Sequence, residues 1–144
     1  ERYLTADPPT PEQVASMSAA IDAVLVGHAP PLPLPLPLVG TAGTVTTLAA
    51  VAQALEPYDP QRVHGAPLAL AEVERQLACY VRLPVFERQK LSGLPAARAD
   101  VITAGAAIVA RIMTRAGAEH LIVNDRGIRW GLVYEMADRR RITR

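Results

Sequence analysis

The sequence predicts an α/β fold that is rich in helix and has few strands. A short apolar segment followed by a glycine turn and a helix occurs twice, at residues 36–48 and 121–133. Most of the remaining chain carries apolar residues at helical spacing. In α/β folds, ligands bind at the carboxyl edge of the sheet, in the turns that follow its strands. We therefore expect these two glycine turns to lie together at such an edge.

The composition and charge of the chain exclude several classes of function. The chain has 144 residues, the length of one domain, and half of them are apolar, so a core can form. The lone Cys79 excludes a disulfide framework and a cysteine zinc site. The net charge is only +1 and no aromatic residues interleave with the C-terminal arginines, which argues against nucleic-acid binding. No apolar run approaches the roughly 20 residues of a membrane span and no signal peptide opens the chain, so we expect a soluble, cytoplasmic protein without membrane contact.

The first helix is predicted by its start signals. Thr10 suits an N-cap, Pro11 the first turn, and Gln13 the last position of a capping box. Apolar residues then recur at helical spacing over residues 14–25, and Gly27 is a suitable C-cap.

A proline-leucine run follows this helix. In residues 30–35 prolines alternate with leucines, so the segment is either an edge strand or a polyproline II approach to a strand at residues 36–39. Its PPLP spacing also suits an exposed arm that docks in aromatic-lined grooves, which would make the chain a non-catalytic interaction module.

Further helices are expected at residues 44–56, 68–81, 84–91 and within 98–117, with a loop at 58–67, a strand at 120–124 and a last helix after residue 127. The helix within 98–117 has the widest apolar face, formed by Val101, Ile102, Gly105, Ile108, Val109, Ile112 and Met113. Two strands are too few for so many helices, because sheets usually have about 4 to 6 strands. Either the rest of the sheet lies upstream of residue 1 or the pattern misses strands within the chain, and we favour the first explanation.

The glycine turn at residues 40–44, GTAGT, is a candidate anion site. It lacks the lysine of a P-loop and the third glycine of a dinucleotide fingerprint. However, Gly40 and Gly43 would let backbone N–H groups approach an anion, and a helix from Thr44 would point its positive end there. Thr41, Thr44 and Thr46 add hydroxyl donors. The alternative is a tight strand-to-helix turn in which Thr44 is only an N-cap.

Four blocks in order resemble the exopolyphosphatase and guanosine pentaphosphate phosphohydrolase family. The blocks are LVGTAGTVTTLAA, RVHG, ERQKLSGLPAARADVITAG and VNDRGIRWGL, and the opening ERYLTADPPTPEQV is similar as well. The resemblance implies the actin-like ATPase and ribonuclease H-like fold, in which two α/β domains close over phosphates. It also implies hydrolysis of the terminal phosphoanhydride of polyphosphate or of guanosine pentaphosphate, generally with a divalent cation such as Mg²⁺.

The resemblance covers only part of the family pattern. It implies that residues 1–144 form the second, C-terminal domain. The water-activating glutamate and two phosphate loops of the family's first domain have no counterpart here, so we expect half of a cleft that is inactive alone. The longer protein could form a homodimer. A sugar-kinase-like half that binds ATP is a further alternative.

The resemblance also implies site residues. The turn formed by Gly40, Thr41, Ala42, Gly43 and Thr44 would face the cleft, and Arg98 would reach phosphate as a forked donor. No catalytic residue and no metal ligand is identified in this chain.

Several other residues have two readings. Asp100 would orient Arg98 or a metal-bound water, or would cap the following helix. Arg126 and Arg129 would line the cleft or be solvated. His64 is either a cleft donor or structural, and we favour the structural role. Glu87 is favoured as a surface ion-pair partner over a general base.

Two positions depart from the family pattern. Asn124 replaces a frequent serine, and Trp130 stands where an acid is common.

Overall fold

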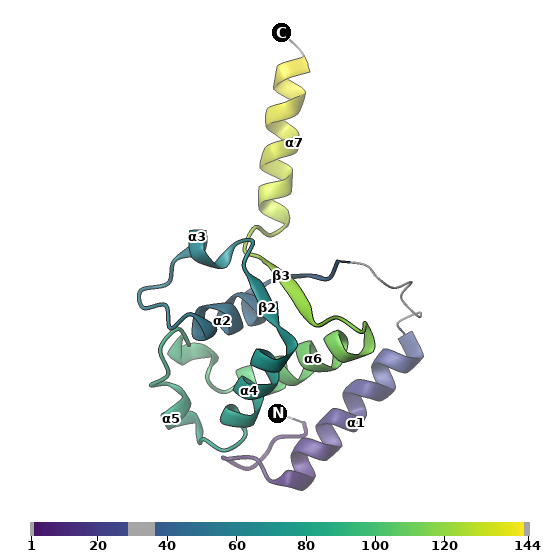
Figure 1. Ribbon diagram of the computed structural model, residues 1–144, viewed down its shortest axis with the longest axis vertical. Coiled ribbons are helices and arrows are strands. Elements are labelled where there is room, and N and C mark those ends of the chain that lie inside the picture. Colours follow the sequence, from purple (N-terminus) through teal and green to yellow (C-terminus); the bar gives the residue numbers. More distant parts are fainter. Residues whose placement is uncertain (1, 29–36, 143–144) are drawn as a thin grey trace.

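The computed structural model describes residues 2–28 and 37–142 (Figure 1). These residues form a small sheet, a set of helices packed on it, and one helix that stands away from the body. The strands are β1 (Val39–Thr41), β2 (Pro67–Ala69) and β3 (His120–Asn124), and the helices are α1 (Pro11–His28), α2 (Gly43–Ala52), α3 (Pro60–Val63), α4 (Leu70–Tyr80), α5 (Val85–Arg88), a 3-10 turn (Ala96–Arg98), α6 (Ile102–Arg115) and α7 (Ile128–Ile142).

The described sheet is mixed, with the strand order β1-β3-β2. Strand β1 runs parallel to β3, with Val39 opposite Ile122 and Thr41 opposite Asn124. Strand β2 runs antiparallel to β3. The helix-rich α/β class is therefore confirmed, and the two glycine turns leave the same edge of the sheet.

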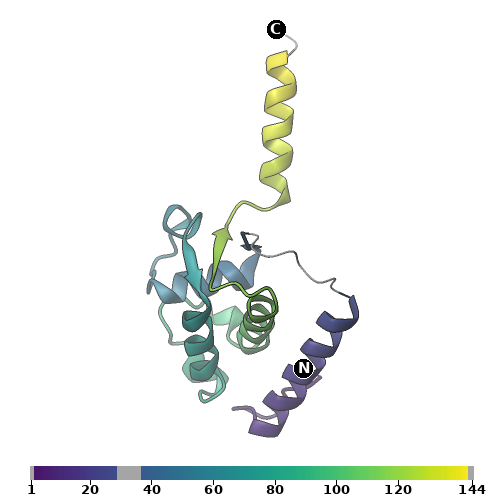
Figure 2. The ribbon, with the colours of Figure 1, turned by 45° about the vertical axis from the view of Figure 1, so that its right-hand side comes forward.

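Helices cover one face of this sheet (Figure 2). Along β3, Leu121 and Val123 are buried whereas His120 and Ile122 are exposed. The buried face packs with α2, α4 and α6 into a single core, and α1 lies on the outer side of α6. Alternating side chains point to opposite faces of a strand, so this pattern describes a two-layer arrangement.

The expected loop at residues 58–67 contains regular structure, so that prediction was wrong. Asp59 caps α3 by accepting a hydrogen bond from the Gln61 N–H at 2.9 Å, and Pro60 occupies the first turn. Pro67 then opens β2, in which Leu68 is buried. A three-residue strand is too short for an alternating pattern to be recognised. One of the strands that we expected upstream of residue 1 therefore lies within the chain, as β2.

Strand β1 also differs from the prediction. It begins at Val39 rather than residue 36, and the pairing starts with the Leu38 carbonyl, which accepts the Ile122 N–H at 2.8 Å. It lies at the edge of the described sheet, as expected for a strand approached through prolines. The predictions for residues 30–35, including the docking arm, lie outside the described residues.

The apolar face expected for α6 is only partly correct. Ile102, Val109 and Met113 are buried, but Val101 and Ile108 are 56% and 43% exposed. The buried face instead includes small side chains, among them Thr103, Ala106, Ala107 and Ala110. Helices approach each other most closely over small residues. Burial on α6 therefore depends on the size of a side chain as well as on its hydrophobicity.

The first helix begins as predicted but lacks the complete capping box. The Thr10 hydroxyl accepts the Gln13 N–H at 3.4 Å. The Gln13 side chain instead accepts a hydrogen bond from the Ala6 N–H and donates one to the Thr5 hydroxyl. It therefore holds the segment before α1 against the start of this helix. Gly27 lies inside α1 and is not its C-cap.

A buried arginine ties the N-terminal segment to the body. Arg88 is 3% exposed, and its guanidinium donates to the Tyr80 carbonyl, to the Thr103 hydroxyl and to the Asp7 carboxylate. Burial lowers the pKa of Arg88, and the charges of Asp7 and Asp100 oppose this shift. Buried charges require such partners, so this cluster fixes α5 against α4 and α6.

Helix α7 extends away from the rest of the molecule (Figures 1 and 2). Its apolar side chains are largely solvent-exposed, with Ile128 91% and Leu132 57% exposed. Within residues 2–28 and 37–142, no helix has the length and apolarity needed to cross a membrane.

Gly93 allows the loop before the 3-10 turn to rest on α2. It has a φ of +82°, and an added Cβ would lie 2.5 Å from the Ala50 carbonyl oxygen. Gly65 has a similar φ of +80° but open space around it.

We predict that Gly65→Ala lowers the free energy of unfolding by about 1 to 2 kcal/mol, from backbone strain alone. Gly93→Ala should cost about 1 to 3 kcal/mol more, because it also overpacks the contact. Urea denaturation measures both, and equal losses would contradict this packing role.

Candidate anion-binding site

The site begins where β1 and β3 end. Because Thr41 lies opposite Asn124, the turn before α2 and the turn before α7 start side by side. Helix α2 starts at Gly43. Its first backbone hydrogen bond is donated by the Thr46 N–H to the Ala42 carbonyl at 3.3 Å. The N–H groups of the three preceding helical residues have no intrahelical acceptor, which is the arrangement that binds anions.

The strained residue of this turn is an alanine. Ala42 has a φ of 73° and a ψ of 175°, a region that side chains rarely occupy. Neither Gly40 nor Gly43 has a φ in the left-handed region. These glycines serve close approach instead, because a Cβ at Gly40 would lie 2.9 Å from Val45 Cγ1.

Gly43 makes room for Arg98. A Cβ at Gly43 would overlap the Arg98 guanidinium, so this cation lies directly against the N-terminus of α2. Within the described part of the chain, the Arg98 side chain has no ion-pair or hydrogen-bond partner. Two positive features, a helix N-terminus and an unpaired guanidinium, therefore lie together.

These groups border a hollow of about 630 Å³. Of the residues predicted for the site, Thr41, Ala42, Gly43, Arg98 and Arg129 line it. Gly40 and Thr44 turn to the other side and line an apolar groove of about 290 Å³ against α6. A Cβ at Gly105 of α6 would lie 2.7 Å from Thr44 Cγ2, so that threonine packs between the helices and does not reach the hollow.

Asp100 and Arg126 do not line this hollow. Asp100 is exposed, and α6 begins after Val101 without a side-chain capping bond, so the capping role was wrong. Arg126 turns toward α7, where its Nη1 donates to the Tyr134 hydroxyl at 2.9 Å and its guanidinium lies over the Trp130 ring. Arg129 is thus the arginine of this turn that borders the hollow.

Thr46, which was predicted as a hydroxyl donor, contributes to the lining of the hollow. Three polar residues of the lining were not predicted as ligand contacts from the chain: Tyr58, Thr47 and Asp125. Burial raises the pKa of Tyr58, and the hydrogen bond and charge of Asp125 raise it further, while a hydrogen bond with Thr46 lowers it. Asp125 could have been found, because it directly follows a strand at the ligand-binding edge. Tyr58 lies in a loop without any periodic signal.

Of two other residues with alternative readings, Glu87 behaves as the favoured one expected, and the role of His64 stays a prediction. The Glu87 carboxylate accepts from the Lys90 ammonium at 2.9 Å on the surface, so Glu87 is an ion-pair residue. His64 lies near the sheet edge, and its Nδ1 is buried without a hydrogen-bond partner among the described residues.

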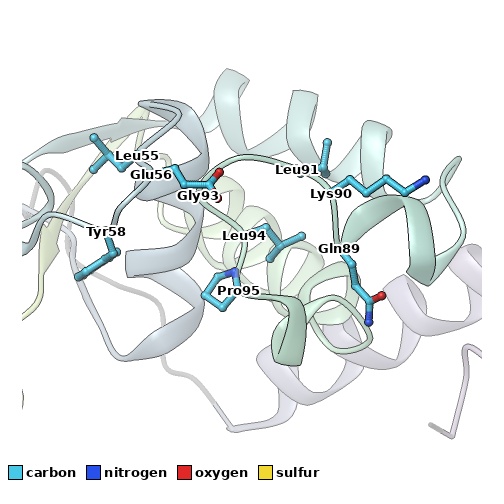
Figure 3. A pocket seen from close by; sticks show the side chains of 9 residues that line it. All are labelled: Leu55, Glu56, Tyr58, Gln89, Lys90, Leu91, Gly93, Leu94 and Pro95. Atoms are coloured by element: carbon cyan, nitrogen blue, oxygen red, sulfur yellow. The ribbon is translucent and has the colours of Figure 1, made fainter.

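A second hollow adjoins the first (Figure 3). Its volume is about 320 Å³, and it shares Tyr58, Gly93 and Pro95 with the larger one. In Figure 3 the Lys90 side chain extends away from Pro95, in keeping with its ion pair to Glu87. This hollow therefore adds a wall of mixed polarity, and its cation Lys90 is paired.

Comparison with known proteins places this geometry in a family. A model of the Ppx/GppA phosphatase family matches residues 1–140. The chain belongs to the Ppx/GppA phosphatase family. The partial match with solved structures of this family is equally clear: a family member from Aquifex aeolicus shares 32% identity and a TM-score of 0.87, over 96% of this chain and 44% of that one.

Two curated relatives are similar in sequence. Exopolyphosphatase 2 of Mycobacterium tuberculosis is 32% identical over 143 residues, which cover 95% of this chain and 45% of the relative. A bifunctional 3-dehydroquinate synthase/phosphatase of Fusobacterium nucleatum is 31% identical over 98 residues, 68% of this chain and 14% of that protein. The chain thus spans less than half the length of these relatives. That residues 1–144 form the second, C-terminal domain stays a prediction.

Gly43→Ala tests the contact between Arg98 and α2. We predict about tenfold weaker binding of tripolyphosphate, since the added Cβ displaces a charged donor worth about 1.5 to 3 kcal/mol. The free energy of unfolding should change by less than about 1 kcal/mol, because alanine favours helix and the arginine side chain can move. Calorimetric titration of the chain measures the affinity. Gly127→Ala is the control: it lines the same hollow, and its added Cβ would meet nothing within 4 Å. Equal effects of the two variants would argue against the contact.

Proposed function

We propose that this chain forms one wall of a cleft in which a terminal phosphoanhydride bond is hydrolysed, with inorganic polyphosphate or guanosine pentaphosphate as substrate. The observation that carries the proposal is the convergence of the α2 N-terminus, Arg98 and Arg129 on one hollow of about 630 Å³. Family membership supports the reaction class, since the similar proteins include an exopolyphosphatase.

The wall acts by electrostatic stabilisation. Water attacks the terminal phosphorus in line and gives up a proton to a base, a new P–O bond forms, and the bond to the bridging oxygen breaks, so that the bridging oxygen leaves with negative charge on the shortened phosphate chain. Arg98 and the free N–H groups of α2 would hold the non-bridging oxygens and the leaving group. Arg129 would add charge from the neighbouring turn. The glutamate that directs the water is proposed to come from the part of the longer relatives that this chain does not span.

The described residues do not fit a protein-built magnesium site. Within residues 2–28 and 37–142, no three carboxylate, histidine or cysteine side chains come together as a metal site. Asp125 is the acid among the residues that line the larger hollow. Mg²⁺ is commonly held by one or two carboxylates together with substrate phosphates. The family's expectation of Mg²⁺ therefore remains a proposal for the longer protein, as do the homodimer and the cytoplasmic location, and no step above depends on a metal.

Arg98 provides the sharpest test of this function. In the full-length protein, Arg98→Ala should lower the rate of phosphate release by about 100- to 1000-fold, the usual effect of removing one transition-state donor. Arg98→Lys should recover little, because an ammonium cannot replace the forked donor. Arg75→Lys is the matched control, since Arg75 pairs with Glu72 on the outer surface. Release of inorganic phosphate measures all three, and full activity of Arg98→Ala would refute the assignment.

The isolated chain tests the division of labour. We expect the pure 144-residue chain to bind tripolyphosphate weakly, to bind it more weakly still as salt screens the charges, and to release no phosphate. Sustained phosphate release by this chain would show that the water-activating group lies within it.

A further inference from the structure

The segment that carries Arg98 is closed at its base by one hydrogen bond. Residues 89–101, the Arg98 segment, connect α5 to α6, and Figure 3 shows part of this segment. Arg88 precedes the segment, Thr103 follows it, and the Arg88 guanidinium donates to the Thr103 hydroxyl. Both side chains are buried in the core. The two ends of the segment are therefore tied together from inside the protein.

Other contacts of the Arg98 segment restrict its position less tightly. The backbone hydrogen bonds described for it span three or four residues, such as the one from the Arg98 N–H to the Pro95 carbonyl at 2.8 Å, so they form local turns. Leu94 and Ala99 bury apolar side chains in the core, but the hydrophobic effect has no preferred direction. A hydrogen bond from a charged donor depends on both distance and angle. The bond at the base therefore does most to fix the direction of the segment.

A carboxylate from the N-terminal part of the chain orients Arg88 in turn. Arg88 Nη2 lies 3.3 Å from an oxygen of Asp7. Both oxygens of this carboxylate also accept the N–H of Val85, the first residue of α5, at 2.9 Å. Asp7 thus holds Arg88 and satisfies an unpaired backbone donor at the start of its helix.

Stability alone is a poor explanation for this buried arginine. Arg88 Nε is buried without a hydrogen-bond partner among the described residues, and such an atom costs free energy. Apolar side chains of similar volume often replace buried ion pairs without loss of stability. A guanidinium, however, reaches several groups at fixed angles. Here they belong to separate parts of the chain: the Asp7 carboxylate, the Tyr80 carbonyl and the Thr103 hydroxyl.

We propose that Arg88 and Thr103 are positioning residues for Arg98. The bond between them sets the Arg98 segment so that the Arg98 guanidinium lies against Gly43 at the N-terminus of α2. Asp7 supports this bond by orienting Arg88. The inference rests on the proposed function, in which Arg98 holds phosphate, and it adds which residues place that donor.

The amide resonance of Gly43 measures this placement directly, because it responds to the charge that lies against the residue. In the 144-residue chain, Thr103→Val removes the hydroxyl at nearly constant volume, so we expect the Arg98 guanidinium to move and the Gly43 resonance to shift. Thr103→Ser keeps a hydroxyl and should retain the original position. Asp7→Asn should shift the resonance in the same direction by less. Its side chain is 44% exposed, so this variant tests the inference even where Thr103→Val does not fold.

Asp22→Asn is the matched control. Asp22 also pairs with an arginine, Arg111, but this pair joins α1 to α6 and does not involve the Arg98 segment. We expect Asp22→Asn to leave the Gly43 resonance and the affinity for tripolyphosphate unchanged.

The affinity for tripolyphosphate, measured by calorimetry, gives the second test. Thr103→Val should weaken binding about three- to tenfold, a typical coupling between residues of one network, and should have no further effect in an Arg98→Ala background. Additive losses, or equal losses in Asp7→Asn and Asp22→Asn, would overturn the inference. An unmoved Gly43 resonance in Asp7→Asn and Thr103→Val would do the same. If the unaltered chain binds no tripolyphosphate, the proposed function fails, and the Gly43 resonance still decides whether these residues place Arg98.

Discussion

The parallel pairing of β1 with β3 is the constraint on which the candidate site depends. It sets Thr41 opposite Asn124, so two chain segments that are more than 80 residues apart turn into helices at the same edge. A register shift of one residue would carry Val123 from the core to the exposed face and would move the turn before α7 along β1. The buried Leu121 and Val123 side chains therefore secure the site as well as the core.

The site also depends on the close approach of chain segments to one another. Glycines allow this approach mainly because they leave space, and less because of their backbone conformation. Gly43 admits the Arg98 guanidinium, Gly93 lets the loop that carries Arg98 lie on α2, and Gly105 admits Thr44 between α2 and α6. Each contact joins segments that are distant in the sequence. The turn residue with an unfavourable backbone is Ala42, at the border of the hollow, and strain of this kind is typical of ligand-contacting turns.

These two facts explain what the sequence could and could not predict. Periodicity located α1, α2, α4, α6 and β3, because each is long enough to repeat a pattern. Periodicity missed β2, because a strand of three residues is too short to repeat a pattern. It also wrongly placed Ile108 in the core. The face of α6 that is buried carries alanines, since closely packed helices favour small side chains over large ones. At the site, glycine chemistry and the family resemblance brought Gly43 and Arg98 together. Thr44 was wrongly predicted to face the hollow and Tyr58 was not predicted at all, because their positions depend on which neighbour packs against them, which no local pattern records.

The charge distribution gives the site its direction. Arg98 lies against the positive end of α2, and Arg129 borders the same hollow, so like charges are gathered there. Asp125 also borders the hollow, but among the described residues neither Arg98 nor Arg129 forms an ion pair with it. Such an arrangement is unfavourable until an anion enters, and the binding of phosphate then relieves a repulsion that already exists in the folded chain. Asp125 limits this positive region on the side of Trp130. A purely anionic chain is therefore attracted up to Asp125 and repelled beyond it.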